Sequence, residues 1–361
     1  MAATRKVRDS AKSKRSARRR GAAGGGEGKS KGKQSGKPGI EYSEAVISNI
    51  IANGGASKHT VPDEALLFGA TVSALGSNIN DMHYKAGMSV GKSLYKVSSA
   101  ANSYSSTEES VDGLVSFLKA AGHKNTTYQA FPDKVEITMH RDGAPKIGAN
   151  LHSFEAGVMS GYLSASERRH VPVSEVACAH NGSDRCRFAT VSFNRKPVPD
   201  SRKALSALAE HIAENSRTAN YYSRSHGEVS HVYHSLSAPL LGDREYSEQM
   251  KSIAGYLGTE VGGKLFNSYN KNRHGNHVVD IAHTIRLLNF GNPIVESILP
   301  FHMSVAFDEL NSKKEFVDVA MSFIDGLIMS GLRTSVQATE RVEDGSYVVD
   351  IKETNLRERR K

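Results

Sequence analysis

The chain contains two cysteines, Cys178 and Cys186, and both lie in one short stretch. They bracket the seven-residue segment AHNGSDR, which includes the turn-forming residues Asn181, Gly182 and Asp184. A thiol pair at this spacing could bind a metal ion, close a small loop as a disulfide, or remain as two inert buried thiols. The separation is wider than that of a usual zinc knuckle, so the spacing alone leaves all three roles open.

The segments beside this pair must position it. The flanks VPVSEVAC and CRFATVSF have the character of two short strands, so we expect a hairpin with the thiols at its loop. In the preceding segment, HSFEAGVMSGYLSA, Phe154, Val158, Met159 and Tyr162 stand near helical spacing. The sequence therefore predicts a helix that leads into the hairpin, an arrangement typical of a substructure held by a metal ion.

Other patterns that could carry catalysis are weak. No G-x-G-x-x-G follows a predicted strand, which argues against a nicotinamide or flavin cofactor. No Ser/His/Asp set or pair of carboxylates stands out, so we predict no catalytic residues. His231 and His234, three residues apart, could share one face of a helix and bind a metal, but the alternative is two surface histidines.

The positive charge of the chain is confined to its start. Residues 1–39 hold 13 Lys/Arg against two acidic residues, a net of +11, within a chain whose net charge is +9. The remaining 34 basic and 36 acidic residues give residues 40–361 a net charge of −2. We expect residues 1–39 to be a disordered basic arm that contacts nucleic acid or an anionic surface, or that only solubilises a near-neutral body.

Composition also bears on the compartment. No run of 18 apolar residues occurs, so we expect no membrane span. No apolar segment follows the basic start as a signal peptide would require, and the two cysteines are clustered. We therefore expect a cytoplasmic protein without a disulfide framework.

The order of the predicted elements is helices, hairpin, helix, hairpin, and it occurs twice. LGTEVGGKLF aligns with AGMSVGKSLY, and Ser322, Phe323 and Gly326 follow Ser153, Phe154 and Gly157 at a constant offset. The sequence thus predicts an α+β fold in two diverged copies, the second with Met321 where the first has His152. We expect the following divisions: a basic tail (1–39), a first domain (40–194), a connector with one helix (195–234) and a degenerate second domain (235–355).

The order of elements in this region resembles that of the 4-vinyl reductase domain family. It runs from a G-x3-G helix through an amphipathic helix and a strand pair to SFEAGVMSGYL and EVACAHNGSDRCRF. That family is related to the Bet3-type subunits of the TRAPP vesicle-tethering complex and to the ligand-binding domains of phenol-sensing activators. The resemblance covers about residues 80–193, with 250–353 as a degenerate copy. It implies a tandem pair of domains in which helices pack on a small antiparallel sheet.

In the sensors of this family, a structural zinc is held by an E-x2-C-x7-C motif and a further ligand 23 residues before the Glu. Glu175, Cys178 and Cys186 match the motif, and His152 occupies the further position, where the family often has Cys. Imidazole is an equally competent zinc donor. The resemblance therefore implies structural zinc at His152, Glu175, Cys178 and Cys186.

Strand geometry constrains this site. Glu175 and Cys178 are three residues apart, which in a regular strand places them on opposite faces. The strand must therefore bulge or end near Ala177, and His180 and Asp184 are the substitutes if Glu175 does not bind. With four protein ligands there is no open position for water, so the site would be structural.

The family's ligand pocket lies between helices and sheet and is mainly apolar. Core packing is the alternative role for each residue that the resemblance places there, and His83 and Tyr84 are the polar candidates to orient a ligand. The implied pocket residues are His83, Tyr84, Met88, Phe117, Phe154, Val158 and Tyr162.

Together these features predict a non-enzymatic, small-molecule-binding or sensory protein with a structural zinc and a polyanion-binding arm. The ligand would be small and apolar or aromatic, and dimerisation is a further expectation. One alternative is a tethering scaffold similar to the Bet3-type subunits. Another is a reductase of tetrapyrrole vinyl groups, as the family name implies, which would need an external source of electrons.

Overall fold

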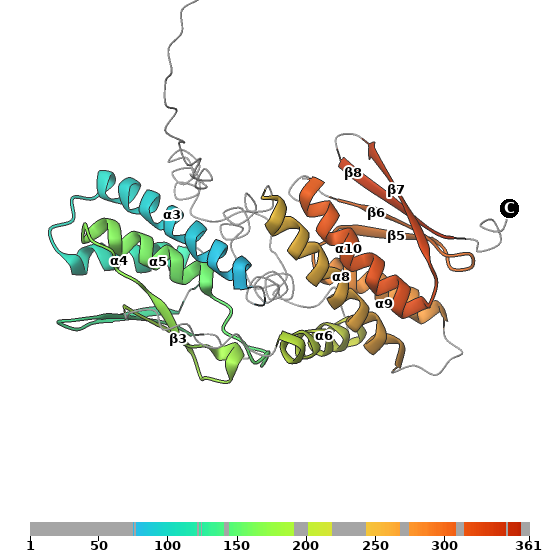
Figure 1. Ribbon diagram of the computed structural model, residues 1–361, viewed down its shortest axis with the longest axis horizontal. Helices are drawn as coiled ribbons and strands as arrows, with labels where there is room; N and C mark the ends of the chain where they lie inside the picture. The colour runs from blue at the N-terminus through green and yellow to red at the C-terminus, as the bar shows by residue number, and fades with distance from the viewer. Residues whose placement is uncertain are drawn as a thin grey trace, which may run out of the picture. The chain divides into compact units, whose positions relative to one another are not determined.

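The computed structural model describes residues 75–354 except 76, 121–122, 124, 141–143, 191–200, 219–242, 268–273, 308–313 and 344–345. In these residues the chain has the predicted α+β class, with helices and two small antiparallel sheets (Figure 1). The basic arm (1–39), the helices expected in 40–74 and most of the connector (195–234) lie outside the described residues. None of the described helices is both long and apolar enough to cross a bilayer.

The described residues of the first half form three helices and a four-stranded sheet with the strand order β1-β2-β4-β3. The predicted hairpin around the cysteines is present as β3 and β4, which are joined through a short 3-10 turn, η1. The elements are α3 (Ser77–Ala101), α4 (Thr107–Ala120), β1 (Thr126–Ala130), β2 (Val135–Met139), α5 (Ser153–Ser166), β3 (Ser174–Ala177), η1 (Ala179–Asn181) and β4 (Cys186–Ala189).

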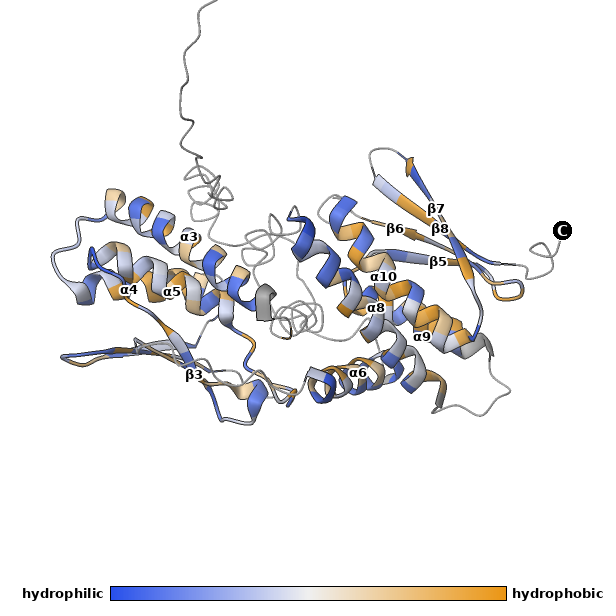
Figure 2. Ribbon diagram, viewed as in Figure 1, coloured by the Kyte–Doolittle hydropathy of each residue, from blue (hydrophilic) through white to orange (hydrophobic). Residues whose placement is uncertain are grey.

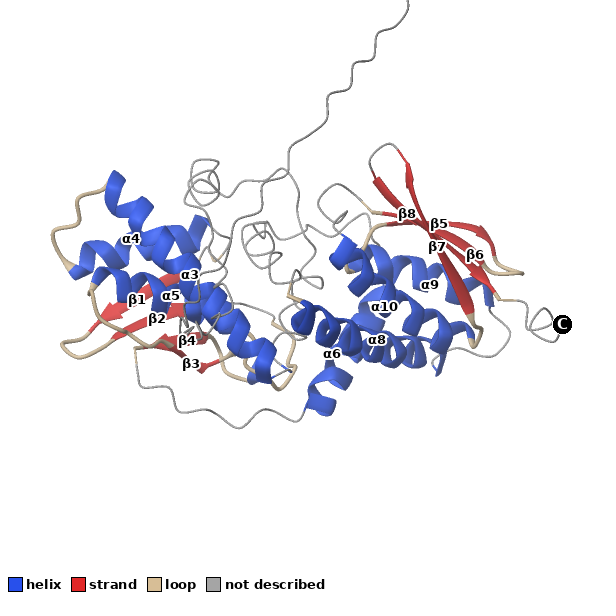
Figure 3. Cartoon of the chain, turned by 45° about the horizontal axis from the view of Figure 1, so that its top comes forward, coloured by secondary structure: helices blue, strands red, loops and turns tan. Residues whose placement is uncertain are grey.

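The second half repeats this order of elements after an additional helix, α6, which lies in the predicted connector. Its sheet has the order β5-β6-β8-β7, and the helices cover one face of the sheet as in the first half (Figure 3). The elements are α6 (Ser201–Thr218), α8 (Arg244–Asn267), α9 (His274–Leu287), β5 (Asn292–Ser297), β6 (His302–Ala306), α10 (Lys314–Leu332), β7 (Val336–Glu343) and β8 (Ser346–Glu353).

Glycines allow the backbones of α3 and α5 to touch. A Cβ atom added to Gly87 would lie 2.2 Å from the carbonyl oxygen of Phe154, and one added to Gly161 would lie 2.0 Å from that of Met88. Real Cβ atoms do not approach backbone this closely, so any side chain there would force the helices apart. This contact fixes the start of α5 relative to α3.

The second half has the same contacts at matching positions. Gly258 of α8 meets the carbonyl oxygen of Phe323 of α10, as Gly87 meets that of Phe154. Gly262 meets Leu327 in the same way, and the added Cβ would lie 2.5 Å from its carbonyl oxygen. The pairing of glycines that the sequence repeat predicts therefore has a structural counterpart in each half.

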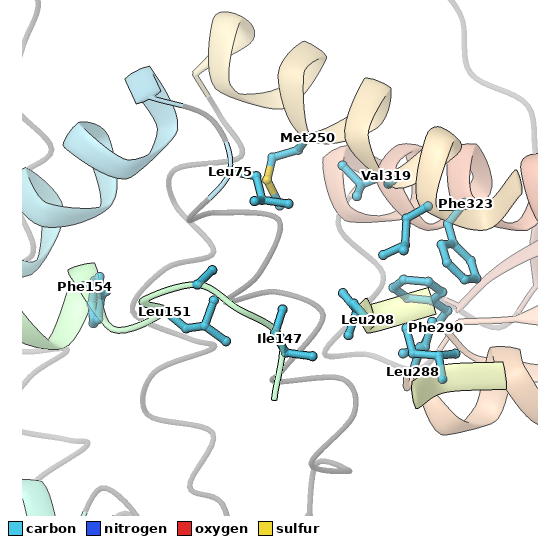
Figure 4. Packing of buried hydrophobic residues seen from close by; sticks show 14 of the residues in the cluster. Leu75, Ile147, Leu151, Phe154, Leu208, Met250, Leu288, Phe290, Val319 and Phe323 are labelled. Atoms are coloured by element: carbon cyan, nitrogen blue, oxygen red, sulfur yellow. The ribbon is translucent and has the colours of Figure 1, made fainter. Parts of the chain in front are cut away.

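Apolar residues fill the space between the helices and the sheet. The hydrophobic face of α10 is prominent in Figure 2, and its Phe323 meets Phe290 edge to face with ring centroids 5.3 Å apart. Leu208 of α6 and Leu288 lie beside this pair (Figure 4). Since α6 contributes a fully buried Leu208, it is part of the core of the second half.

The glycine contacts generate a matched test within α8. Replacing Gly258 with Ala would place a methyl group 2.0 Å from a backbone oxygen, whereas at Gly263 the nearest atom would be the Ser330 hydroxyl, 3.4 Å away. We expect Gly258→Ala to lower the free energy of unfolding by about 1–3 kcal/mol or more. Gly263→Ala should be neutral or raise it by up to about 1 kcal/mol through helix propensity. Urea denaturation measures both, and equal effects would show that the close contact is absent.

Candidate metal centre

Four side chains from separate parts of the first half converge on one point. One nitrogen, oxygen or sulfur atom from each of His152, Glu175, Cys178 and Cys186 lies within 4.8 Å of the corresponding atoms of the others. All four residues are buried, the two cysteines being 1% exposed. No disulfide joins the two cysteines. We call this set the four-ligand group.

A bulge in β3 brings Glu175 and Cys178 to the same side. The register of β3 against β4 shifts between Glu175 and Ala177, and β3 ends at Ala177. The extra residue, Val176, is turned outward and is 36% exposed. The irregularity that the three-residue spacing requires is therefore present, because a bulge changes which face the following side chain occupies.

His152 enters the group from the start of α5, where it is the N-cap residue. Its Nδ1 atom lies 2.6 Å from one Glu175 oxygen, and its backbone N–H donates to the other oxygen at 3.3 Å. A carboxylate at a helix start is favoured, since the first backbone N–H groups have no partner within the helix. Glu175 thereby ties α5 to β3.

The loop between the cysteines is wound around the sulfur atoms. The backbone N–H of Ala179 donates to Cys186 Sγ at 3.3 Å, and those of Asn181 and Ser183 donate to the Cys178 carbonyl at 3.0 and 3.1 Å. Gly182 closes the turn with a positive φ of 92°, a conformation that glycine adopts without cost. An N–H directed at sulfur stabilises the thiolate that metal binding requires.

A neighbouring segment is held against this loop by hydrogen bonds. The backbone N–H groups of Ile147 and Gly148 both donate to the His180 carbonyl, at 2.8 and 2.9 Å. The His180 ring bonds through Nδ1 to the Pro145 carbonyl at 3.0 Å, and Asn150 donates to the Glu175 carbonyl at 3.2 Å. The loop thus connects the four-ligand group to the chain that leads into α5.

The predicted substitutes for Glu175 have other roles. His180 is buried and uses its ring to hold Pro145, and Asp184 is exposed and pairs with Arg185 at 2.6 Å. Neither belongs to the four-ligand group. Sequence analysis overlooked Asn150, whose amide joins Glu175 to Asn181, because only the fold brings these positions together.

The ionisation of the group in the absence of a metal follows from its contacts. Burial lowers the pKa of His152, but the charge of Glu175 and hydrogen bonds to Cys178 and Glu175 raise it well above its usual value. Burial raises the pKa of Glu175, and the His152 charge outweighs this and lowers it. A hydrogen bond to Cys186, together with burial, raises the pKa of Cys178. The metal-free group is therefore an imidazolium–carboxylate pair beside a protonated thiol.

The donor set fits a metal ion. Two thiols, an imidazole and a carboxylate are the ligand types that a thiophilic divalent ion takes in a tetrahedral site. Burying the His152–Glu175 ion pair carries a desolvation cost. A divalent cation at the same position would offset the negative charge of two thiolates and the carboxylate together. Because protein atoms would fill all four positions, such a site would hold the fold and leave no place for a reacting water.

Comparison with known families covers the region that carries this group. Residues 131–191 match the family model of the 4-vinyl reductase domain. No curated protein and no solved structure matches the chain. The match supports a 4-vinyl reductase domain in the first half, and it spans β2, α5, β3 and β4 with all four residues of the group.

The polar residues expected in the ligand pocket of such a domain have protein partners. His83 is buried beside Phe154, and burial lowers its pKa to about 4. Its Nε2 atom also meets the Tyr246 hydroxyl of α8. The hydroxyl of Tyr84 donates to the Val173 carbonyl at 3.2 Å. His83 is thus neutral, and both residues bond to other parts of the protein.

The expected apolar residues of that pocket come from three helices. Val158 and Tyr162 of α5 are fully buried, Phe117 of α4 and Phe154 of α5 nearly so, and Met88 of α3 is half-buried. The Tyr162 hydroxyl lies 3.3 Å from that of Tyr104, a neighbour that sequence analysis did not identify.

Metal binding to the four-ligand group should depend steeply on pH. At neutral pH the metal must displace at least two protons, one from His152 and one from Cys178, because both pKa values are raised. The apparent affinity should therefore rise about 100-fold per pH unit between about pH 6 and 8. Competition with a chelator at several pH values measures this slope. A pH-independent affinity would contradict the assignment of ligands.

Proposed function

We propose that the chain is a non-enzymatic small-molecule-binding or sensory protein, built on a 4-vinyl reductase domain that a structural zinc ion holds together. The observation that carries this proposal is the buried four-ligand group inside the family match. Its donors come from an N-cap, a bulged strand and a short loop, so an ion there would join three elements. That position suits a structural role and offers no open coordination site for chemistry.

The assignment of zinc rests on ligand type. Two cysteines with one histidine and one carboxylate provide the sulfur and nitrogen donors that zinc favours. Hard ions such as Mg²⁺ and Ca²⁺ take oxygen ligands and do not suit a site with two thiols. Zinc also has no redox chemistry, which agrees with a role in holding the fold.

The ligand site that we propose lies between α3, α4, α5 and the first sheet. Phe117, Phe154, Val158 and Tyr162 of these helices belong to the buried hydrophobic core, and Met88 of α3 is half-buried. Such apolar surroundings favour a small apolar or aromatic ligand over a charged one. His83 is neutral at physiological pH, because burial lowers its pKa to about 4, so it could hydrogen-bond a ligand without adding charge.

The second half, 235–355, would be a degenerate copy of the first domain, 40–194, and the two would form a tandem pair related to the Bet3-type fold. Supporting this are the equal order of elements, the equal strand order and the matching glycine contacts of α3/α5 and α8/α10. Met321 stands where the first half has His152 and is half-buried at the core. The second copy would therefore lack the four-ligand group and serve as a structural partner.

The basic arm, 1–39, would supply contact with a polyanion. Its net charge of +11 exceeds the net charge of the whole protein, which is +9. Such an arm binds phosphate groups through a salt-dependent, sequence-independent attraction. In this proposal the 4-vinyl reductase domain senses a ligand and the arm places the protein on nucleic acid.

A tethering scaffold is the second candidate function, and one observation favours it. The β5–β6 hairpin exposes Ile294, Ile298 and Leu299, the last being 77% exposed. Contiguous exposed apolar residues of this kind mark protein contacts. A protein that acts mainly through such contacts, with its arm on anionic lipid, would match this candidate.

Metal analysis of purified protein tests the zinc proposal. We expect about one equivalent of zinc that resists dialysis and is lost in Cys178→Ser and Glu175→Gln. Glu136→Gln is the matched control, since Glu136 lies on β2, beside β4, and pairs with the half-exposed Lys134 at 2.7 Å. A chelator should lower the melting temperature of the wild type and of Glu136→Gln but not of Cys178→Ser. Zinc content unchanged by Cys178→Ser would refute the site.

Two measurements separate sensory from tethering functions. Native mass spectrometry of the full chain should show a retained small molecule in addition to zinc if the 4-vinyl reductase domain binds a ligand. Binding to duplex DNA should weaken with salt and disappear on deletion of residues 1–39. If no small molecule is retained, and if liposome flotation rather than DNA binding requires the arm, the tethering function is favoured.

A further inference from the structure

A second set of metal-ligating side chains lies in the other half of the protein. Atoms of Glu296, His302 and Asp350 fall within 4.8 Å of one another on the second sheet. In β6, Met303 and Val305 are completely buried against the helices, so the alternate residues His302 and Ser304 face the opposite side of the sheet. The three residues, which we call the carboxylate–histidine group, thus lie on the face turned away from the helices.

The sheet brings the three residues together from three strands. Ser304 of β6 pairs directly with Asp350 of β8, and His302 lies two residues before Ser304 on the same face. Glu296 sits in a bulge of β5, where the register against β6 shifts between Val295 and Ser297. Bulges redirect side chains and are frequent beside functional sites. This one accompanies the only acidic residue of β5.

The short oxygen–oxygen contacts of this group outnumber the protons that can bridge them. Ser304 Oγ lies 2.6 Å from a Glu296 oxygen and 2.7 Å from Asp350 Oδ1. A hydroxyl has one proton, so it can donate to only one of the two carboxylates at a time. The other short contact then joins two oxygen lone pairs, which is unfavourable unless a further positive charge is close.

The contacts of His302 also leave room for a further positive charge. His302 Nδ1 lies 2.9 Å from Glu296 Oε2, so this nitrogen carries the ring proton. Its Nε2 atom is buried and makes no hydrogen bond, and it faces Asp350 Oδ1 at 3.9 Å. That distance is too long for a hydrogen bond but within the about 4.2 Å that two metal–ligand bonds of about 2.1 Å can span.

The charges around the group leave it negative. Ser304 Oγ lies 2.7 Å from Asp350 Oδ1, and the nearby cations that act on Asp350 are Arg341 and Lys352. Arg341 pairs with the other Asp350 oxygen, but it also pairs with Glu343 at 2.8 Å. One guanidinium is therefore shared between two carboxylates, and the contacts of Glu296 are with the Ser304 hydroxyl and His302 Nδ1.

We propose that the carboxylate–histidine group is a second metal site, for a divalent transition ion of borderline hardness such as Zn²⁺ or Co²⁺. His302 Nε2 and Asp350 Oδ1 are its inner ligands, and Glu296 supplies a carboxylate oxygen. One nitrogen with two oxygen donors suits such ions better than Ca²⁺ or Cu⁺. The side chain of Glu296 is 43% exposed, so water completes the coordination and the site is open to solvent.

Cobalt distinguishes this site from the four-ligand group, because only the latter has sulfur donors. In equilibrium dialysis of the full chain against Co²⁺, we expect one tight equivalent with a sulfur-to-cobalt charge-transfer absorption and a weaker one without it. His302→Gln should abolish the weaker equivalent and leave the charge-transfer absorption unchanged. Glu296→Gln should weaken that equivalent by about 10–100-fold.

Two controls make the outcome decisive. His170→Gln removes an exposed histidine outside both groups, and a His231→Gln/His234→Gln double variant removes the pair that spacing alone could make a metal site. Both should bind cobalt as the wild type does. Circular dichroism checks folding, and Glu296→Gln changes an exposed side chain in case His302→Gln unfolds. The proposal is overturned if the wild type binds one equivalent only, or if Glu296→Gln and His302→Gln bind as it does.

Discussion

The backbone contact between α3 and α5 is the constraint on which the first half depends. Glycines in both helices remove the side chains that would keep the axes apart, and Gly157 in turn allows α5 to reach the Tyr84 carbonyl of α3. The first residues of α5 are thereby fixed against the sheet, and His152 is the N-cap of that helix. A loose helix pair would leave the imidazole free to move by more than the tolerance of a metal site. The glycines do not belong to the four-ligand group, but the helix contact that they allow determines where His152 lies.

Within the four-ligand group, contacts between the buried charges offset the cost of removing them from water. An imidazolium and a carboxylate are buried side by side, and burial opposes the charge of each. Their mutual attraction offsets that cost only in good geometry, which the 2.6 Å contact and the bond from the His152 backbone N–H provide. Such a pair keeps His152 and Glu175 in contact, so that a bound ion would replace protons at atoms that already lie together.

Local spacing predicted the helix and the hairpin, whereas the four-ligand group was predicted from the resemblance to a known family, because the cysteine spacing alone left a metal site, a disulfide and inert thiols open. The sequence itself contains the turn residues between the cysteines and the helical spacing before them. It also contains the three-residue interval that required a bulge. The carboxylate–histidine group was not predicted, since Glu296, His302 and Asp350 come from three strands and meet only through register. The partners of His83 and Tyr84 were missed for the same reason: Tyr246 and Val173 are distant in sequence. The spacing of residues predicts the structure of one segment, whereas contacts between distant segments are known only once the topology of the fold is known.

The final hairpins of the two halves differ in the length of their ladders. β3 and β4 share three residue pairs interrupted by a bulge, whereas β7 and β8 share eight pairs in unbroken register. A ladder of eight pairs holds a hairpin through its backbone hydrogen bonds, but three pairs with a long loop hold it weakly. A metal–thiolate cross-link between Cys178 and Cys186 would supply the connection that the shorter ladder lacks. The second hairpin contains no cysteine and is held by its longer ladder.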